Sequence, residues 1–182
     1  MIFKKSMNRN YFHTQESRKI QLIEPQMGYR DDAWLGNAYY FWIDIYDANK
    51  WGVEAKNATG LYEIYSADID FSDILDTVFN EKHYNFWLES INKVAQKHID
   101  LLNTKPTLKD LNDYLKKEGC WNEVSGIQFQ DLPEDRERLK VAPIQYGTRF
   151  KYFNYIKRIQ LAIFNKTIIS NFTLHCKVQI TK

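Results

Sequence analysis

The segment from residue 149 to residue 158 interleaves basic and aromatic side chains, and it begins with Arg149, Lys151 and Tyr152. Cations can bind phosphate groups and aromatic rings can stack on bases, so this pattern favours contact with a nucleic acid. A strand with a solvated basic face and a buried aromatic face would give the same pattern. Because the net charge is only +2, any such binding must come from a local patch.

A second group of candidate residues lies between residues 35 and 52, where a turn, a short strand and a helix start follow one another. A Gly-Asn pair beginning at Gly36 suits a tight turn, and the aromatic run that includes Tyr40 favours a strand. Ala48 and Trp51 then stand at helical spacing. Burial in a core would account for these aromatic residues without any function.

Polar residues that could take part in catalysis flank this stretch. His13 and Thr14 follow an aromatic pair near the N-terminus, Asp131 stands at the end of an expected strand, and Gln160 lies in a late apolar strand. Each also has a structural explanation, such as packing on a strand for His13 or a turn before proline for Asp131. His98 has no second ligand one helical turn away, so we expect a structural histidine and no metal site.

Three of these stretches resemble, in order, the three motifs of the ADP-ribosyltransferase superfamily. The matching residues are Tyr11–Thr14, Gly36–Phe41 and Arg158–Phe164. The similarity is to the branch with a His, Tyr and Glu triad, which includes the poly(ADP-ribose) polymerases. It covers residues 11–52 and 158–172, and it implies NAD as the cofactor.

The implied reaction breaks the bond between nicotinamide and ribose in NAD. The leaving group departs neutral, but the ribose becomes oxocarbenium-like, so the site must hold and stabilise a cation. By resemblance, His13 anchors the ribose and Thr14 holds the nicotinamide amide through its backbone. Tyr40 and Trp51 close on the two faces of the nicotinamide, each worth roughly 1 kcal/mol on cation–π estimates. Ala48 is the small residue that lets the ring approach.

The chain departs from the family pattern at three positions. Gly36 keeps the first glycine of the second motif, whereas Ala38 replaces the second, and Thr14 stands where the family usually has glycine. Gln160 stands in place of the catalytic Glu. An amide can accept a hydrogen bond from the ribose 2′-hydroxyl but carries no charge. Transfer then relies on a strong nucleophile or on another carboxylate, for which we select Asp131.

The resemblance implies a mono-ADP-ribosyltransferase toxin that modifies a nucleic acid base or a protein. A sequence rich in Lys, Asn and Ile, with no targeting domain, is similar to toxins of toxin–antitoxin or phage-defence systems, so a cognate antitoxin is a possible partner. One alternative is a transferase-like module that binds a nucleotide or protein without catalysis. Another is transfer of an RNA 2′-phosphate to NAD, for which we find no matching Arg and His groups.

The elements that position these residues predict an α+β protein. We expect a strongly curved, split, mostly antiparallel sheet with helices on one side, similar to ADP-ribosyltransferases, and a helical insertion over residues 80–120. The segment from Met27 to Trp34 is expected to form a flap beside the cofactor. Strands are expected over residues 10–15, 61–70, 126–132, 157–164 and 172–180, and helices over residues 83–102 and 107–118, the second with a capping box at Thr107.

Length and composition are those of one globular domain. The chain has 182 residues, of which 44% are hydrophobic and 15% aromatic, and we expect a single domain over residues 1–182. Cys120 and Cys176 form neither a zinc spacing nor a disulfide framework, which favours a reducing compartment. No apolar run reaches the ~20 residues of a membrane helix. We therefore expect a cytoplasmic protein without membrane contact.

Overall fold

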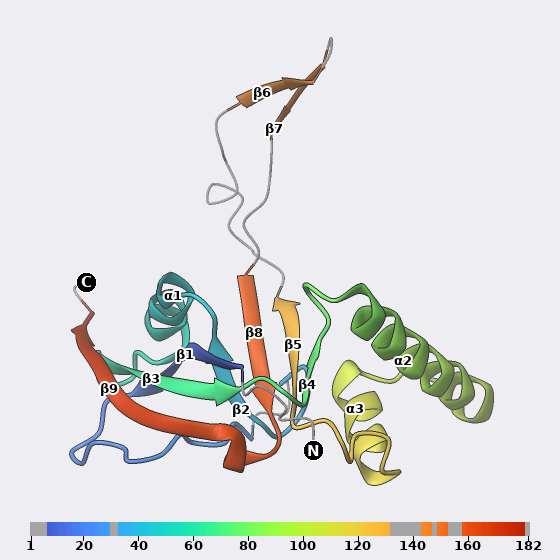
Figure 1. Ribbon diagram of the computed structural model, residues 1–182, viewed down its shortest axis with the longest axis horizontal. Coiled ribbons are helices and arrows are strands. Elements are labelled where there is room, and N and C mark those ends of the chain that lie inside the picture. The colour runs from blue at the N-terminus through green and yellow to red at the C-terminus, as the bar shows by residue number, and fades with distance from the viewer. Residues whose placement is uncertain (1–6, 30–32, 132–142, 147–148, 153–157, 181–182) are drawn as a thin grey trace.

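The protein is a mixed α+β structure built on one seven-stranded open sheet (Figure 1). This computed structural model describes residues 7–29, 33–131, 143–146, 149–152 and 158–180. The strand order is β4-β5-β8-β2-β1-β3-β9, and every pair is antiparallel except β4 with β5. The strands are β1 (Asn8–Glu16), β2 (Tyr39–Trp42), β3 (Leu61–Asp70), β4 (Ile74–Asp76), β5 (Gly126–Asp131), β8 (Arg158–Ile163) and β9 (Ile169–Gln179).

The stretch from residue 35 to residue 52 folds as its sequence predicts. Gly36 has a φ of +73°, a conformation that glycine adopts without steric cost, and it ends the turn before β2. Helix α1 (Ile45–Ala55) follows β2 and begins at Asp44, whose carboxylate accepts a hydrogen bond from the amide of Tyr46. The turn, the strand and the helix are therefore all confirmed.

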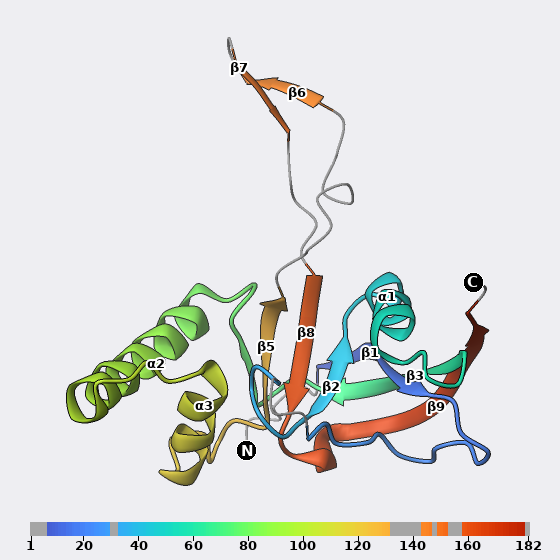
Figure 2. The same cartoon turned by 180° about the vertical axis from the view of Figure 1, so that it is seen from behind.

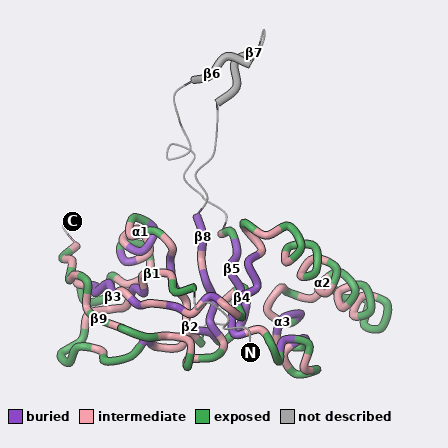
Figure 3. Tube along the Cα trace, in the orientation of Figure 1, coloured by how far each residue is buried: buried purple, intermediate pink, exposed green. Residues whose placement is uncertain are grey.

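The predicted mid-chain helices are α2 (Glu81–Leu102) and α3 (Leu108–Lys117), and both lie between β4 and β5 in the chain. The side chain of Asn80 accepts hydrogen bonds at the start of α2. Thr107 and Asp110 form the expected capping box of α3, which confirms Asp in the third position. Although α2 carries a clear apolar stripe, none of its residues is buried, and its contacts run along α3 and β4 (Figure 3).

The two faces of the sheet carry different cores. On one face, a cluster that includes Tyr11, Phe41 and Leu161 packs against Phe172 of β9, because the sheet curls over itself. On the other face, α1 covers residues such as Trp42, and α3 covers residues such as Phe129. Figure 2 shows α1 at one end of the sheet and α2 and α3 at the other. The prediction of helices on one side agrees with this packing.

Some elements differ from their sequence prediction. β4 was not predicted, because three residues are too few to show a periodic pattern. Residues 17–25 form an irregular loop without a helix. β6 (Pro143–Tyr146) and β7 (Arg149–Tyr152) form a separate two-stranded sheet. The side chains of the nucleic-acid candidates Arg149, Lys151 and Tyr152 lie outside the described part of the chain.

Candidate functional site

The centre of the sheet is split between β1 and β2. The two strands are registered only at Phe12 and Trp42. One residue further along β1, the ring of His13 spans the gap, and its Nδ1 donates a hydrogen bond of 2.8 Å to the carbonyl of Tyr40. A side chain thus takes the place of a backbone ladder bond at the point where the strands separate.

A cleft of about 680 Å³ opens at this split, within the size range of cofactor sites. The segment from Gln26 to Tyr29 and Trp34 line one part of it, so this segment lies where a flap was expected. Residues from β1, β2, α1, β5 and β8 contribute the rest. Six of the residues selected from the sequence line this one cleft: His13, Thr14, Tyr40, Trp51, Asp131 and Gln160.

His13 is the most strongly perturbed group of the cleft. Its side chain is 5% exposed, and burial lowers its pKa to about 4, with the positive charge of Lys56 contributing. The imidazole is therefore neutral at pH 7. Because Nδ1 carries the proton that is donated to Tyr40, Nε2 is left as an acceptor. Among the described residues, Nε2 has no hydrogen-bond partner, and the atom is buried in a ring that packs against Phe41 and Phe172.

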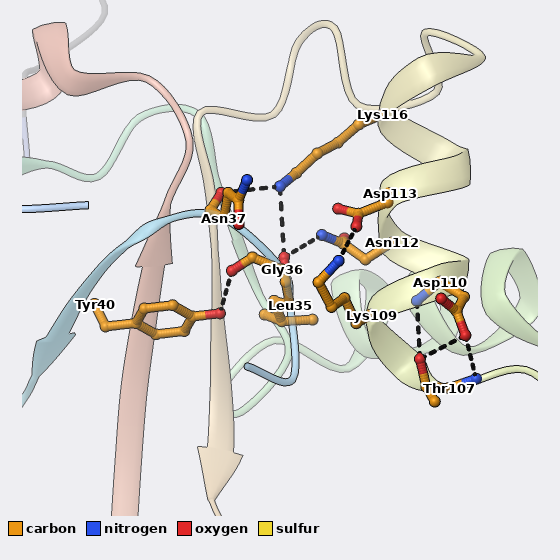
Figure 4. Close-up of polar contacts among 10 residues, drawn as sticks. All are labelled: Leu35, Gly36, Asn37, Tyr40, Thr107, Lys109, Asp110, Asn112, Asp113 and Lys116. Atoms are coloured by element: carbon orange, nitrogen blue, oxygen red, sulfur yellow. Dashed lines mark hydrogen bonds and ion pairs between the residues drawn. The ribbon is translucent and has the colours of Figure 1, made fainter. Parts of the chain in front are cut away.

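Tyr40 reaches from the cleft to the turn before β2 (Figure 4). Its hydroxyl donates a hydrogen bond of 2.8 Å to the carbonyl of Gly36, and burial raises its pKa to about 12. Helix α3 fixes the same turn, because Asn112 donates to the carbonyl of Leu35 at 2.6 Å and Lys116 contacts the carbonyls of Leu35 and Asn37. The helical insertion therefore sets where the ring of Tyr40 lies.

Gly36 and Ala48 lie outside the lining of the cleft. A Cβ on Gly36 would meet the Asp113 carboxylate at 2.5 Å, so this glycine allows α3 to approach the turn. Ala48 is a fully buried residue of α1, and its carbonyl accepts a hydrogen bond from the hydroxyl of Thr14 at 2.8 Å. Both residues lie behind the side chains that line the cleft, and their predicted contact with a cofactor stays a prediction.

Indole rings form much of the apolar surface of the cleft. Trp51 of α1 packs on Trp42 of β2, with 6.0 Å between the ring centroids. Trp34, which is 41% exposed, stacks on Phe129 at 6.2 Å. The predicted aromatic surface beside Tyr40 is therefore larger than the sequence indicated. Rings of this size suit a planar ligand.

Gln160 lies on β8 opposite Trp42 and Phe129, and its side chain faces the cleft. Asp131 stands on the neighbouring strand, registered with Arg158. The Nε atom of Arg158 lies 3.3 Å from an oxygen of Asp131. The expected second carboxylate is thus in the cleft, but the cation beside it partly offsets its charge.

The sequence interpretation did not select Arg158 and Glu54 as site residues, although both line the cleft. Glu54 follows Trp51 by three residues on α1, and that spacing places the two on one helix face. Arg158 precedes Gln160 by two residues on a strand and so shares its face. Both could have been found from the sequence by looking for charged residues that share a helix or strand face with Trp51 or Gln160.

The described residues bring together no group of three His, Cys, Asp or Glu side chains that could hold a metal ion. None of their helices combines the length and the apolar character needed to cross a bilayer.

Comparison of the chain with protein-family models, curated proteins and solved structures gave no match. The resemblance to ADP-ribosyltransferases therefore stays a prediction from the motif residues. Those residues come from three distant parts of the chain, and the structure places one member of each, His13, Tyr40 and Gln160, in the same cleft. No family membership follows from the comparisons.

Proposed function

We propose that the protein is an NAD-dependent mono-ADP-ribosyltransferase with an ADP-ribosyltransferase-like fold. One observation carries the proposal: His13, Tyr40 and Gln160, which were selected from motif order alone, line one cleft at a split in the sheet. Residues that serve only as separate parts of a core have no reason to meet in one cleft. The volume of about 680 Å³ is sufficient for a dinucleotide.

Each side chain takes a role that its geometry permits. The unprotonated Nε2 of His13 accepts a hydrogen bond from a ribose hydroxyl. Tyr40 and Trp51 provide aromatic surface for the nicotinamide ring, whose positive charge is attracted to such faces. Gln160 accepts from the 2′-hydroxyl of the nicotinamide ribose, and Thr14, which also lines the cleft, holds the amide through its backbone.

The absence of a Glu at position 160 determines which acceptors suit the enzyme. Gln160 gives no full negative charge to the oxocarbenium-like ribose, and the ion pair with Arg158 partly offsets the negative charge of Asp131. A good nucleophile reduces the need for that charge. We therefore favour the amine of a nucleic acid base as the acceptor over a protein side chain.

The biological role that fits this activity is that of a toxin in a toxin–antitoxin or phage-defence system. Modification of a nucleic acid would stop growth. Expression without an antitoxin should then inhibit growth, and His13→Ala or Tyr40→Ala should abolish the inhibition while the protein stays folded. Growth inhibition retained in both variants would contradict the assignment.

Incubation with NAD labelled in its adenylate part tests the activity directly. The protein is mixed with RNA, DNA and lysate proteins in parallel, and transfer of label to any of these polymers is expected. His98→Asn, which changes a histidine of α2 that does not line the cleft, is the matched control for His13→Asn. Free ADP-ribose without labelled polymer would indicate NAD hydrolysis only, and the absence of both would overturn the proposal.

A binding module without catalysis is the second candidate. The observation that favours it is that both carboxylates lining the cleft, Glu54 and Asp131, lie beside the guanidinium of Arg158. Neither then offers an unopposed charge to a developing cation. Binding of NAD, measured by calorimetry, without cleavage under any of the conditions above would support this alternative.

A further inference from the structure

Arg158 is the least exposed cation that lines the cleft. The residue is 5% exposed, and its guanidinium carbon lies 4.6 Å from the centre of the Trp42 ring. Burial of a guanidinium is costly unless its charge and its N–H groups are matched by partners. The arrangement of those partners shows what the group can bind.

Two carboxylates contact Arg158 at ion-pair distances. Its Nε lies 3.3 Å from Asp131 and one terminal nitrogen lies 3.6 Å from Glu54. Charge-assisted hydrogen bonds to carboxylates are usually shorter, at about 2.7–2.9 Å. Among the described residues Nε has no aligned hydrogen-bond partner. The carboxylates therefore hold the charge in place, although neither gives the Nε–H group an aligned acceptor.

We infer that Arg158 binds the diphosphate of a nucleotide ligand in this cleft. A guanidinium presents a planar fork of N–H donors that matches phosphate oxygens, and its charge cannot be removed near neutral pH. Aromatic rings for a base or nicotinamide line the same cleft. This inference deepens the proposed function and rests on it for the identity of the dinucleotide.

The ion pairs predict opposite changes in diphosphate affinity for two substitutions, Asp131→Asn and Arg158→Gln. If Arg158 binds phosphate, Asp131 competes with the ligand for the same guanidinium. Asp131→Asn should then tighten binding of a diphosphate, because the competing charge is gone. Arg158→Gln should weaken it. If Arg158 only holds the fold together, both substitutions should weaken binding, since each breaks the same ion pair.

Calorimetry with ADP and with adenosine provides the test. For Arg158→Gln we expect at least a tenfold loss of ADP affinity and little change for adenosine, which lacks phosphate. Arg158→Lys keeps the charge but loses the fork, and should lie between the wild type and Arg158→Gln. Lys97→Gln is the matched control, because it removes one positive charge, as Arg158→Gln does, from an exposed residue of α2. It should bind ADP as the wild type does.

Several outcomes would overturn the inference. They are unchanged ADP affinity in Arg158→Gln, weaker ADP binding in Asp131→Asn, loss of ADP binding in Lys56→Gln alone, and no ADP binding by the wild type. If Arg158→Gln fails to fold, Arg158→Lys and Asp131→Asn still decide the question. Binding of ADP requires no cleavage of NAD, so Arg158-dependent binding without transfer would reject the proposed enzyme and keep this site.

Discussion

The two sides of β1 are joined to the sheet in very different ways. On one side, all nine residues of β1 are registered with β3. On the other side, β1 meets β2 at Phe12 alone. The first junction is an ordinary antiparallel ladder, whereas the second is a split whose edges diverge from one contact.

This difference shows how the protein makes a site in the middle of a sheet. Along the ladder, backbone groups satisfy one another and leave nothing for a ligand. At the split, side chains replace the ladder: His13 bonds to the carbonyl of Tyr40, and Thr14 bonds to the carbonyl of Ala48. The polar atoms left over, such as Nε2 of His13, face no backbone partner. The split is thus both the weakest junction of β1 and the location of the cleft.

The largest effect should come from removing only the unpartnered atom at the split. In His13→Asn, the amide nitrogen can still donate to the carbonyl of Tyr40, but Nε2 is gone. We expect transfer from NAD to fall roughly 100-fold or more, as for loss of one polar group in a preorganised site. Labelled-NAD assays measure the loss, and circular dichroism checks the fold.

The matched variant His98→Asn lies on α2, outside the lining of the cleft, and should keep full activity. If His13→Asn keeps wild-type transfer, the imidazole at the split serves packing alone. If both variants lose activity, the loss of transfer is not specific to the histidine at the split.

The pH dependence of stability should also distinguish the split from the ladder. The pKa of His13 falls from 6.5 to about 4 on folding. As the pH drops below 6.5, the unfolded chain takes up a proton that the folded chain refuses, so the free energy of unfolding decreases. Between pH 6.5 and 4 this group removes roughly 3 kcal/mol, at 1.36 kcal/mol per pKa unit.

Urea unfolding of the wild type and of His13→Asn at a series of pH values isolates this contribution, because other groups titrate in both. The difference between the two proteins should shrink steadily toward pH 4. Parallel curves across that range would show that His13 is protonated normally in the folded protein.

Local sequence signals predicted the elements that depend on neighbours in the chain. The turn at Gly36, the helix after Asp44 and the capping box at Thr107 each involve residues at most four positions apart, and all three were confirmed. Periodicity likewise predicted α2, although it could not indicate how little of that helix would be buried. β4 was missed, since its short parallel pairing with β5 leaves no local pattern.

Long-range register was the part that the sequence could not supply. The pairing of Asp131 with Arg158 follows from the register of β5 on β8, which no local pattern encodes. The approach of Glu54 to the same guanidinium depends on how α1 sits over the sheet. Of the six residues selected from the sequence that line the cleft, five came from the motif resemblance, and Asp131 was selected as a carboxylate at the end of a strand. Arg158, the cation beside Asp131, was not selected.

Asn112 tests whether α3 supports the split side of the sheet in particular. This side chain is 1% exposed, donates to the carbonyl of Leu35 and accepts from the indole of Trp121 at 2.9 Å. Asn112→Ala leaves both partners buried without it, and should cost about 2 kcal/mol of stability in urea unfolding. The exposed Asn92→Ala on α2 should change stability by less than about 0.5 kcal/mol.

Hydrogen exchange localises the effect of Asn112→Ala. The amide of Gly28 donates to the carbonyl of Ala38, next to the turn that Asn112 holds. Its exchange should accelerate more than that of the amides between β1 and β3. Equal acceleration on both sides would mean that α3 stabilises the whole sheet and does not support the split selectively.

The smallest effect should come from restoring a charge at position 160. Gln160→Glu places a carboxylate on the cleft face of β8, where it would stabilise the developing ribose cation for any attacking group, including water. Hydrolysis of NAD should therefore rise several-fold relative to transfer. Gln130→Glu makes the same change at an exposed position on β5 and should leave the ratio unaltered. An unchanged ratio in Gln160→Glu would mean that this side chain does not face the reacting ribose, even though it shares a cleft with His13.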